Sequence, residues 1–348
     1  MIGLAVRRFG LVSALGFNAP STLAALRAGI SAVRRTDWLD RETGQPLRGA
    51  LVPLPQWWEG TGKLADLAAP AIAECLAALP PDEAARTPIL LGVAAAGRPG
   101  RFADLDTLLM PQIQARLGWV AHPLSRLFAA DQTGCVDALA LAAELIDTGR
   151  AAHVVVAGVD SFLQRDTLEA MQRQRRVMTP GNSNGFFPGE AGAAALVGRA
   201  GAPGAGPALR ILGAGRALEH ARIDSTEALR AQGLTQAVKT ALAGAGVALK
   251  DIAYRLTDLS GEHYKFKEAA FVAGRLNGGE RAKPLGLWHP IEYLGEIGAA
   301  IVPCLLAQAA HAALHGYAPG PLALCHVGSD AGERAALVLQ MEQTEEGE

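Results

Sequence analysis

Apolar residues in the first 200 positions form two kinds of pattern, short continuous runs and longer segments with helical spacing. The continuous runs predict strands that are buried on both faces, at 1–6, 88–96, 154–156 and 193–197. The helical spacing predicts helices at 22–28, 64–79, 139–146 and 166–177, and in part of 98–116. Gly149 stands where the third of these helices should end. Residues 31–61 show no clear period and predict loops and edge structure.

The second part of the chain repeats this pattern after a segment rich in glycine and proline. Residues 200–207, Ala-Gly-Ala-Pro-Gly-Ala-Gly-Pro, predict a linker. Beyond it we expect strands at 208–215, 253–258, 322–327 and 335–341, and helices at 229–244, 264–275 and 295–311. The repetition predicts an α/β protein with two βαβ-type halves, at 1–200 and 208–348, related by an internal duplication.

Composition and charge narrow the possible functions. The chain has 348 residues, half of them hydrophobic, and its 32 basic and 34 acidic side chains give a net charge of −2. A large core is therefore expected, and charge gives no reason to propose nucleic acid as a partner. No apolar segment is long enough for a membrane span, and Arg7-Arg8 interrupt the apolar N-terminus, which reads as a strand rather than a signal peptide. Four scattered cysteines favour a reducing, cytoplasmic setting.

Cys135 is the first candidate for chemistry because the turn Thr133-Gly134-Cys135 stands where a buried helix should begin. The positive end of a helix dipole and free backbone amides favour a thiolate and would hold an acyl oxyanion. The alternative is that Cys135 has only a structural role, as a small buried hydrophobic residue. No motif for a metal ion, a phosphate loop or a dinucleotide is present, so no cofactor is expected.

Three segments together carry a resemblance to a known family. They are the turn Thr133-Gly134-Cys135, the turn Ala157-Gly-Val-Asp-Ser161 after the next strand, and Gly185-Phe-Phe-Pro-Gly-Glu190-Ala-Gly-Ala-Ala-Ala. They resemble the thiolase superfamily, in particular the β-ketoacyl synthases. The resemblance implies a five-layered αβαβα fold, a dimer, and an acyltransferase that loads acyl groups from an acyl-carrier protein or coenzyme A onto Cys135. It also implies that Phe187 lies near the substrate pocket.

The two histidines of a condensing ketosynthase have no clear counterpart in this sequence. Ser260-Gly261-Glu262 stands where the family has His-Gly-Thr, and His263 is three residues away. For the second histidine, alignment on Gly295 and Gly298 favours Glu292 over His289, whose spacing to the glycines is three residues too long. Three residues of helix rotate a side chain by most of a turn, so His289 would face elsewhere.

The last motif departs from the family as well. His326-Val-Gly328-Ser-Asp330-Ala-Gly matches the turn whose second aromatic residue gates the acyl pocket, so Asp330 replaces that gate. The resemblance thus puts carboxylates of Asp137, Glu292 and Asp330 near Cys135. Negative neighbours raise the pKa of a thiol and oppose carbanion formation, although a buried glutamate can act as a base in simple acyl transfer. Backbone amides near Cys135 or Gly328 would be the oxyanion donors.

Two functional hypotheses follow. One is an atypical acyltransferase that uses Cys135, with Glu292 or His289 and Ser260 completing the catalytic site and Gly328, Asp330, Phe187 and His263 lining the pocket. The other is a degenerate ketosynthase homologue that acts as a binding or scaffold partner, alone as a homodimer or paired with an active ketosynthase. A weaker similarity to ketosynthase-like proteins encoded beside type VI secretion genes favours such an accessory role.

Overall fold

Ten of the described strands form one continuous sheet that consists of two matching halves. The computed structural model describes residues 3–55, 59–119, 122–201, 207–277 and 285–342. The first half contains β1 (Leu4–Ser13), β4 (Ile89–Val93), β5 (Arg126–Ala129), β6 (His153–Ser161) and β7 (Glu190–Arg199). The second contains β8 (Leu209–Leu218), β9 (Tyr254–Thr257), β10 (Gly286–Trp288), β11 (Leu322–Gly328) and β12 (Glu333–Met341).

The strand order shows an internal symmetry. It runs β5-β4-β6-β7-β1 and continues β8-β12-β11-β9-β10, so each strand has a counterpart at the mirrored position. Directions match too, because β4 is parallel to β5 and β6, as β9 is to β10 and β11, whereas the inner pairs are antiparallel. Residues 4–6 of β1 join the halves through antiparallel pairing with β8. The predicted pseudo-duplication of the fold is therefore visible in the sheet.

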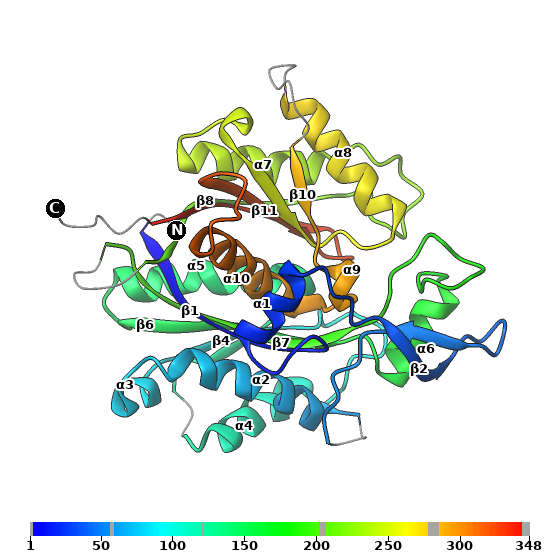
Figure 1. Cartoon of the computed structure of the whole chain (residues 1–348), viewed down its shortest axis with the longest axis horizontal. Helices are drawn as coiled ribbons and strands as arrows, with labels where there is room; N and C mark the ends of the chain where they lie inside the picture. The colour runs from blue at the N-terminus through cyan, green and yellow to red at the C-terminus, as the bar shows by residue number, and fades with distance from the viewer. Residues whose placement is uncertain (1–2, 56–58, 120–121, 202–206, 278–284, 343–348) are drawn as a thin grey trace.

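Helices and sheet halves alternate in five layers (Figure 1). The central layer is α5 (Gly134–Asp147) and α10 (Ile301–Leu314), which share one core with strands of both halves. The outer face of the first half is covered by α2 (Thr61–Leu76) and α4 (Leu105–Leu117), beside the short α3 (Pro81–Ala85). The outer face of the second half is covered by α7 (Gln232–Ala245) and α8 (His263–Asn277). The αβαβα architecture expected from the sequence is confirmed.

Burial on both faces explains the continuous apolar runs. In β6, every residue from Val154 to Ser161 is buried, because α2 packs on one face and the central layer on the other. The central layer approaches closely at Gly158, where an added Cβ would lie 2.1 Å from the carbonyl oxygen of Ala299. A glycine is therefore required at this point of β6.

Some elements differ from the sequence-based expectation. The segment 31–61 contains a hairpin, β2 (Arg34–Leu39) and β3 (Pro46–Gly49), after the helix α1 (Ala19–Arg27). The short strands β5 and β10 were not predicted, since three or four residues carry too little periodicity. The linker expected at 200–207 falls largely on 202–206, outside the described residues.

The helix expected to open at Gly295 begins six residues later. Instead, α9 (Ile291–Leu294) ends at Gly295, which has a φ of 70°, and a short 3-10 turn, η3 (Gly298–Ala300), precedes α10. Gly298 also has a positive φ, 49°. The positive φ angles of these two glycines break the helix. Their spacing in the sequence is by itself compatible with a continuous helix. In the described part of the chain, no helix combines the length and apolar character needed to cross a membrane.

Candidate functional site

A strained turn connects β5 to the central helix α5. It is the 3-10 turn η1 (Asp131–Thr133), and Asp131 has a φ of 47°, in the left-handed region that non-glycine residues rarely adopt. Directly after it, Gly134 packs against β5, since a Cβ there would meet the carbonyl oxygen of Phe128 at 2.8 Å. Strain of this kind persists only where the surrounding structure imposes it, so the conformation of Asp131 is fixed by its neighbours in the fold.

Cys135 lies on the side of this turn that is buried in the protein core. Its side chain is fully buried, and its single S–H group has two carbonyl acceptors within reach, the oxygens of Ala157 (3.2 Å from Sγ) and Ala299 (3.3 Å from Sγ). Burial raises the pKa of the thiol to about 12, and the negative charge of Asp137 adds to the rise. Burial therefore opposes the thiolate expected at this helix start, although a hydrogen bond with the backbone of Gly92 acts to lower the pKa. Cys135 in this state is a thiol hydrogen-bond donor.

A polar cavity of about 740 Å³ opens on the other side of the turn. Asp131 lies in its wall, together with residues of α6 (Arg165–Arg173) and of the segments that follow β4, α6, β8, β9 and β11. Four arginines and four carboxylates supply the charged groups of the wall, namely Arg98, Arg175, Arg176 and Arg222 with Asp131, Asp224, Glu262 and Asp330. Cys135 is not among the residues that line it. This hollow is hereafter called the Asp131 cavity.

Arg98 and Asp160 form the first buried ion pair beside Asp131. Two guanidinium nitrogens of Arg98 bind the two carboxylate oxygens of Asp160, and its Nη1 lies 3.3 Å from Oδ1 of Asp131. Phe162 lies under the guanidinium, with 4.6 Å from Cζ to the ring centroid. Asp160 also accepts the backbone N–H groups of Ser161 and Ala299. Burial raises the pKa of Asp131 to about 6, the charge of Arg98 counteracts this rise, and the charge of Asp160 adds to it.

Arg176 holds the opposite wall of the cavity. Its Nε donates to Glu262 at 2.7 Å, and its Nη1 donates to Asp330 at 2.5 Å. Burial alone would raise the pKa of Asp330, but the charge of Arg176 lowers it. Asp330 thus lines the cavity as a paired, ionised carboxylate rather than as an apolar gate.

A third buried cation, Lys265, lies close to the turn at Asp131. The Nζ of Lys265 lies 3.1 Å from Asp258 and 3.5 Å from Glu296. Glu296 also accepts the Gln132 amide at 3.2 Å and the backbone N–H of Gly298 at 3.0 Å. Burial raises the pKa of Glu296, while the neighbouring Lys265 counteracts it. The residues next to the turn at Asp131 are therefore held by charged hydrogen bonds from both halves of the chain.

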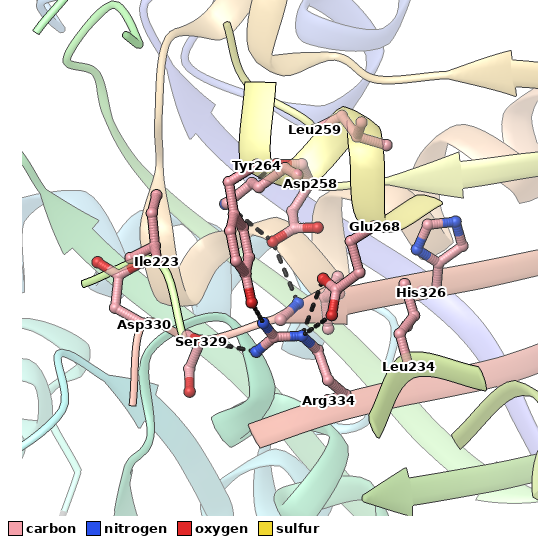
Figure 2. Close-up of a pocket in the computed structure, with 13 residues that line it drawn as sticks. Ile223, Leu234, Asp258, Leu259, Tyr264, Glu268, His326, Ser329, Asp330 and Arg334 are labelled. Carbon is pink, nitrogen blue, oxygen red and sulfur yellow. Dashed lines mark hydrogen bonds and ion pairs between the residues drawn. The ribbon is translucent and has the colours of Figure 1, made fainter. Parts of the chain in front are cut away.

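A cluster of polar and charged side chains around Arg334, in the second half of the chain, fills the space beside Asp258. Figure 2 shows Arg334 bound by Glu268, the Tyr264 hydroxyl and the carbonyl oxygen of Ser329. The contacts measure 2.8 Å to Glu268, 2.8 Å to Tyr264 and 2.9 Å to Ser329. Because the guanidinium donors are occupied, this cluster ties α8 to β12 and has a structural role.

The residues proposed for the first histidine position lie near the cavity and form no hydrogen bond with Cys135 among the described residues. Ser260 is buried and its hydroxyl donates to Glu262 at 3.3 Å. His263 begins α8 with an exposed side chain, and its backbone N–H donates to Asn184. Glu262, next to Ser260, is the member of this segment that lines the cavity.

The structure separates both candidates for the second position from Cys135. The Glu292 side chain is about half exposed, and its carboxylate lies 3.9 Å from Nδ1 of His289. His289 packs edge-on against Phe266 of α8. The buried carboxylate of this region is Glu296, four residues further on, because the glycine turn at 295 redirects the chain. The alignment on glycines had not anticipated that turn.

The remaining pocket candidates have separate environments. The backbone N–H of Gly328 donates to Asp258 at 3.2 Å, so it is already used as a donor. Phe187 lines a different hollow, of about 360 Å³, where Arg48 lies 4.9 Å over its ring. Glu190 satisfies loop groups, because it accepts from Val52 and Ser161 and pairs with Lys63.

Sequence reasoning missed the residues that the fold gathers at the cavity floor, chiefly Asp131, Arg98 and Glu296. The available signal was an acidic residue in an otherwise apolar approach to the central helix, Phe128-Ala-Ala-Asp131. A lone aspartate before a helix is usually an N-cap, so this signal is weak without the backbone conformation. No group of three or more His, Cys, Asp or Glu side chains suited to a metal ion occurs among the described residues.

Comparisons with solved structures agree with this fold. A β-ketoacyl synthase from Burkholderia phymatum matches 99% of this chain over 100% of its own, with a TM-score of 0.76 and 17% identity. A ketosynthase in complex with its chain length factor from Xenorhabdus doucetiae matches 98% of this chain over 98% of its own, with a TM-score of 0.69 and 15% identity. A type II polyketide acyl-carrier protein in complex with its ketosynthase gives a match covering 97% of this chain and 99% of that chain, with a TM-score of 0.77 and 14% identity.

No family model matches the chain, and no curated protein matches it. At identities of 14–17% the likeness to ketosynthases and to a ketosynthase with its chain length factor shows a shared thiolase-like fold. The activity of this chain is therefore argued from its own residues.

Proposed function

We propose that this chain is a non-condensing member of the ketosynthase fold, which acts as an accessory partner in the manner of a chain length factor. The observation that carries the proposal is the state of Cys135. Its thiol has no exposed surface, and its S–H group has two backbone carbonyl oxygens within reach. A nucleophile must reach the acyl carbon of a substrate as a thiolate, and this thiol meets neither requirement.

The ion pairs around the cavity support the same conclusion. Decarboxylative condensation requires groups that stabilise negative charge as it develops. Each of the buried cations here, Arg98, Arg176 and Lys265, is already bound to two carboxylates. The surplus of carboxylates would oppose a carbanion or an oxyanion.

An exposed strand edge supports a role in assembly. Strand β5 ends the sheet and is paired only with β4 among the described residues. An edge strand presents unpaired N–H and C=O groups to a partner chain. Because β5 leads directly into the turn at Asp131, a partner that added a strand there would also contact the approach to the cavity floor. We expect either a homodimer or a heterodimer with an active ketosynthase.

The competing hypothesis is an acyltransferase that uses Cys135. It would require the Sγ to leave the carbonyl oxygens of Ala157 and Ala299 and to enter the cavity past the backbone of α5. It would also require a base, and Glu292 would have to move from its half-exposed position beside His289. No contact of the described residues favours this rearrangement.

The decisive experiment for this choice is intact-protein mass spectrometry after incubation with acyl-coenzyme A and acyl-carrier thioesters. We expect no acyl adduct on the wild-type protein beyond that on a Cys135→Ala variant. An adduct of defined mass that disappears in Cys135→Ala would overturn the proposal and establish the acyltransferase.

The accessory role is tested by native mass spectrometry of the chain alone and mixed with an active ketosynthase from the same organism. We expect a stable complex that changes the rate or the product length of the ketosynthase, unaffected by Cys135→Ala. A chain that neither associates with a ketosynthase nor changes its products would refute this role.

A further inference from the structure

One carboxylate oxygen in the Asp131 cavity has no partner. Asp131 is 5% exposed, and its Oδ1 accepts the backbone N–H of Ala95 at 2.7 Å and faces Arg98. No hydrogen bond within the described residues falls on Oδ2, and Oδ2 is not one of the fully enclosed unsatisfied atoms. Since Asp131 lines the cavity, Oδ2 is the atom that remains open to it. A buried carboxylate oxygen without a protein partner is costly unless something binds it.

The other carboxylates of the floor are satisfied by the protein itself. Asp160 is bound by two nitrogens of Arg98 and by two backbone N–H groups. Asp330 and Glu262 each receive two hydrogen bonds from Arg176. Asp131 is thus the acceptor that the cavity offers to a ligand.

The charge around the cavity indicates the sign of that ligand. The four arginines and four carboxylates of the wall balance each other. Beyond the wall, Lys265 faces two carboxylates, Asp258 and Glu296, and Asp160 is a third carboxylate, bound to Arg98 of the wall. With every group ionised, the carboxylates exceed the cations by two. A surplus of buried negative charge favours a cation and disfavours an anion.

We propose that the Asp131 cavity binds a small organic ammonium ion, which donates a charge-assisted hydrogen bond to Oδ2 of Asp131. The volume of about 740 Å³ accommodates a molecule larger than a metal ion or ammonium itself, and the charged groups of the wall offer partners to a polar ligand. Asp131 lines this cavity and has a φ of 47°, a strained conformation that persists only where the surrounding structure imposes it. The inference goes beyond the accessory role and does not depend on it.

The test is isothermal titration of the full chain with ethanolamine, 1,4-diaminobutane and tyramine, each compared with its N-acetyl derivative. We expect at least one amine to bind and its acetylated form not to bind. Binding should weaken as the pH is lowered through about 6, where Asp131 takes up a proton. Absence of binding by all three amines, or equal binding of the acetylated forms, would overturn the proposal.

Three variants locate the site. Asp131→Asn should weaken amine binding roughly tenfold or more, the loss expected for a charge-assisted hydrogen bond. Asp82→Asn is the matched control, because Asp82 is an exposed aspartate that pairs with Arg86 outside the cavity, and it should leave binding unchanged. Gly97→Leu fills the cavity, since a Cβ at Gly97 meets nothing within 4 Å, and should abolish binding in a folded protein.

The outcomes separate the proposal from its alternatives. Amine binding that persists in folded Asp131→Asn or in Gly97→Leu refutes this site, and Gly97→Leu decides the matter if Asp131→Asn does not fold. Binding of acetate or phosphate in place of the amines shows that the arginines dominate and also refutes it. None of these results depends on acyl loading or on a ketosynthase partner, so failure here is distinct from failure of the proposed function.

Discussion

The two sides of the turn before α5 differ sharply, although only three residues lie between Asp131 on one side and Cys135 on the other. On one side Cys135 is enclosed by backbone, and Gly92 approaches so closely that a Cβ there would lie 2.7 Å from its Sγ. On the other side Asp131 opens into a cavity with ion pairs in its wall. Cys135 belongs to a reactive residue type but is held in an inert state. Asp131 belongs to a common residue type, but its backbone is strained and one carboxylate oxygen lacks a hydrogen-bond partner within the described part of the chain. Reactivity at this turn therefore follows the environment and not the residue type.

The largest expected effect is a contrast in thiol reactivity between the two sides. All four native cysteines are buried, so wild-type protein should resist iodoacetamide until it unfolds. A thiol introduced by Asp131→Cys, in a Cys135→Ala background, should react at least roughly a hundredfold faster than Cys135, which is reached only through local opening. Peptide mass spectrometry over a time course measures both rates. Comparable rates at the two positions would contradict the separation described above.

The next effect concerns the ion pairs of the cavity wall. Arg176→Ala leaves Glu262 and Asp330 without their cation and should lower the free energy of unfolding by about 3–5 kcal/mol. Arg173→Ala is the control, because Arg173 is exposed and its contact with Glu169 should contribute less than about 1 kcal/mol. Urea denaturation measures both. Similar values for the two variants would mean that the Arg176 network is relaxed in solution.

A smaller effect probes the packing around Cys135. Gly92→Ala forces a Cβ to within 2.7 Å of Sγ and should cost about 1–3 kcal/mol of unfolding free energy. Adding Cys135→Ala removes the sulfur, so the double variant should recover part of that loss, which a double-mutant cycle quantifies. Gly97→Ala, where the new Cβ meets open space, should be nearly neutral. Strict additivity of the Gly92 and Cys135 changes would show that Sγ is not packed against Gly92.

The smallest expected effect is a pH dependence from Asp131. Burial raises its folded pKa to about 6, above the usual value of 3.8, so the native state binds more protons between these values. Stability from this group is therefore present at low pH and is lost as the pH rises through 6. Between pH 7 and pH 5 the wild type should gain about 1 kcal/mol relative to Asp131→Asn. A constant difference between the two proteins would show that Asp131 keeps an ordinary pKa.

The elements were largely predictable, but the site was not. Buried strands such as β6 and the Ala-rich α5 follow from local patterns that persist in the fold. The prediction for Glu292 depended instead on counting residues from Gly295 and Gly298. Their positive φ angles, 70° and 49°, break the helix on which that count relied. Backbone conformation at glycine is decided by tertiary contacts, so residue spacing could not reveal that Glu296 is the buried carboxylate.

The sequence by itself determined the layered α/β architecture, because hydrophobic periodicity is a local record of which faces are buried. It also predicted that Cys135 would lie at the start of a buried helix. Only the tertiary structure decided which side chains face the cavity. Three cations, Arg98, Arg176 and Lys265, meet carboxylates from distant parts of the chain, whereas Cys135 is enclosed by backbone. Burial and partner atoms set the protonation state of a side chain, and neither is encoded in its neighbours along the chain.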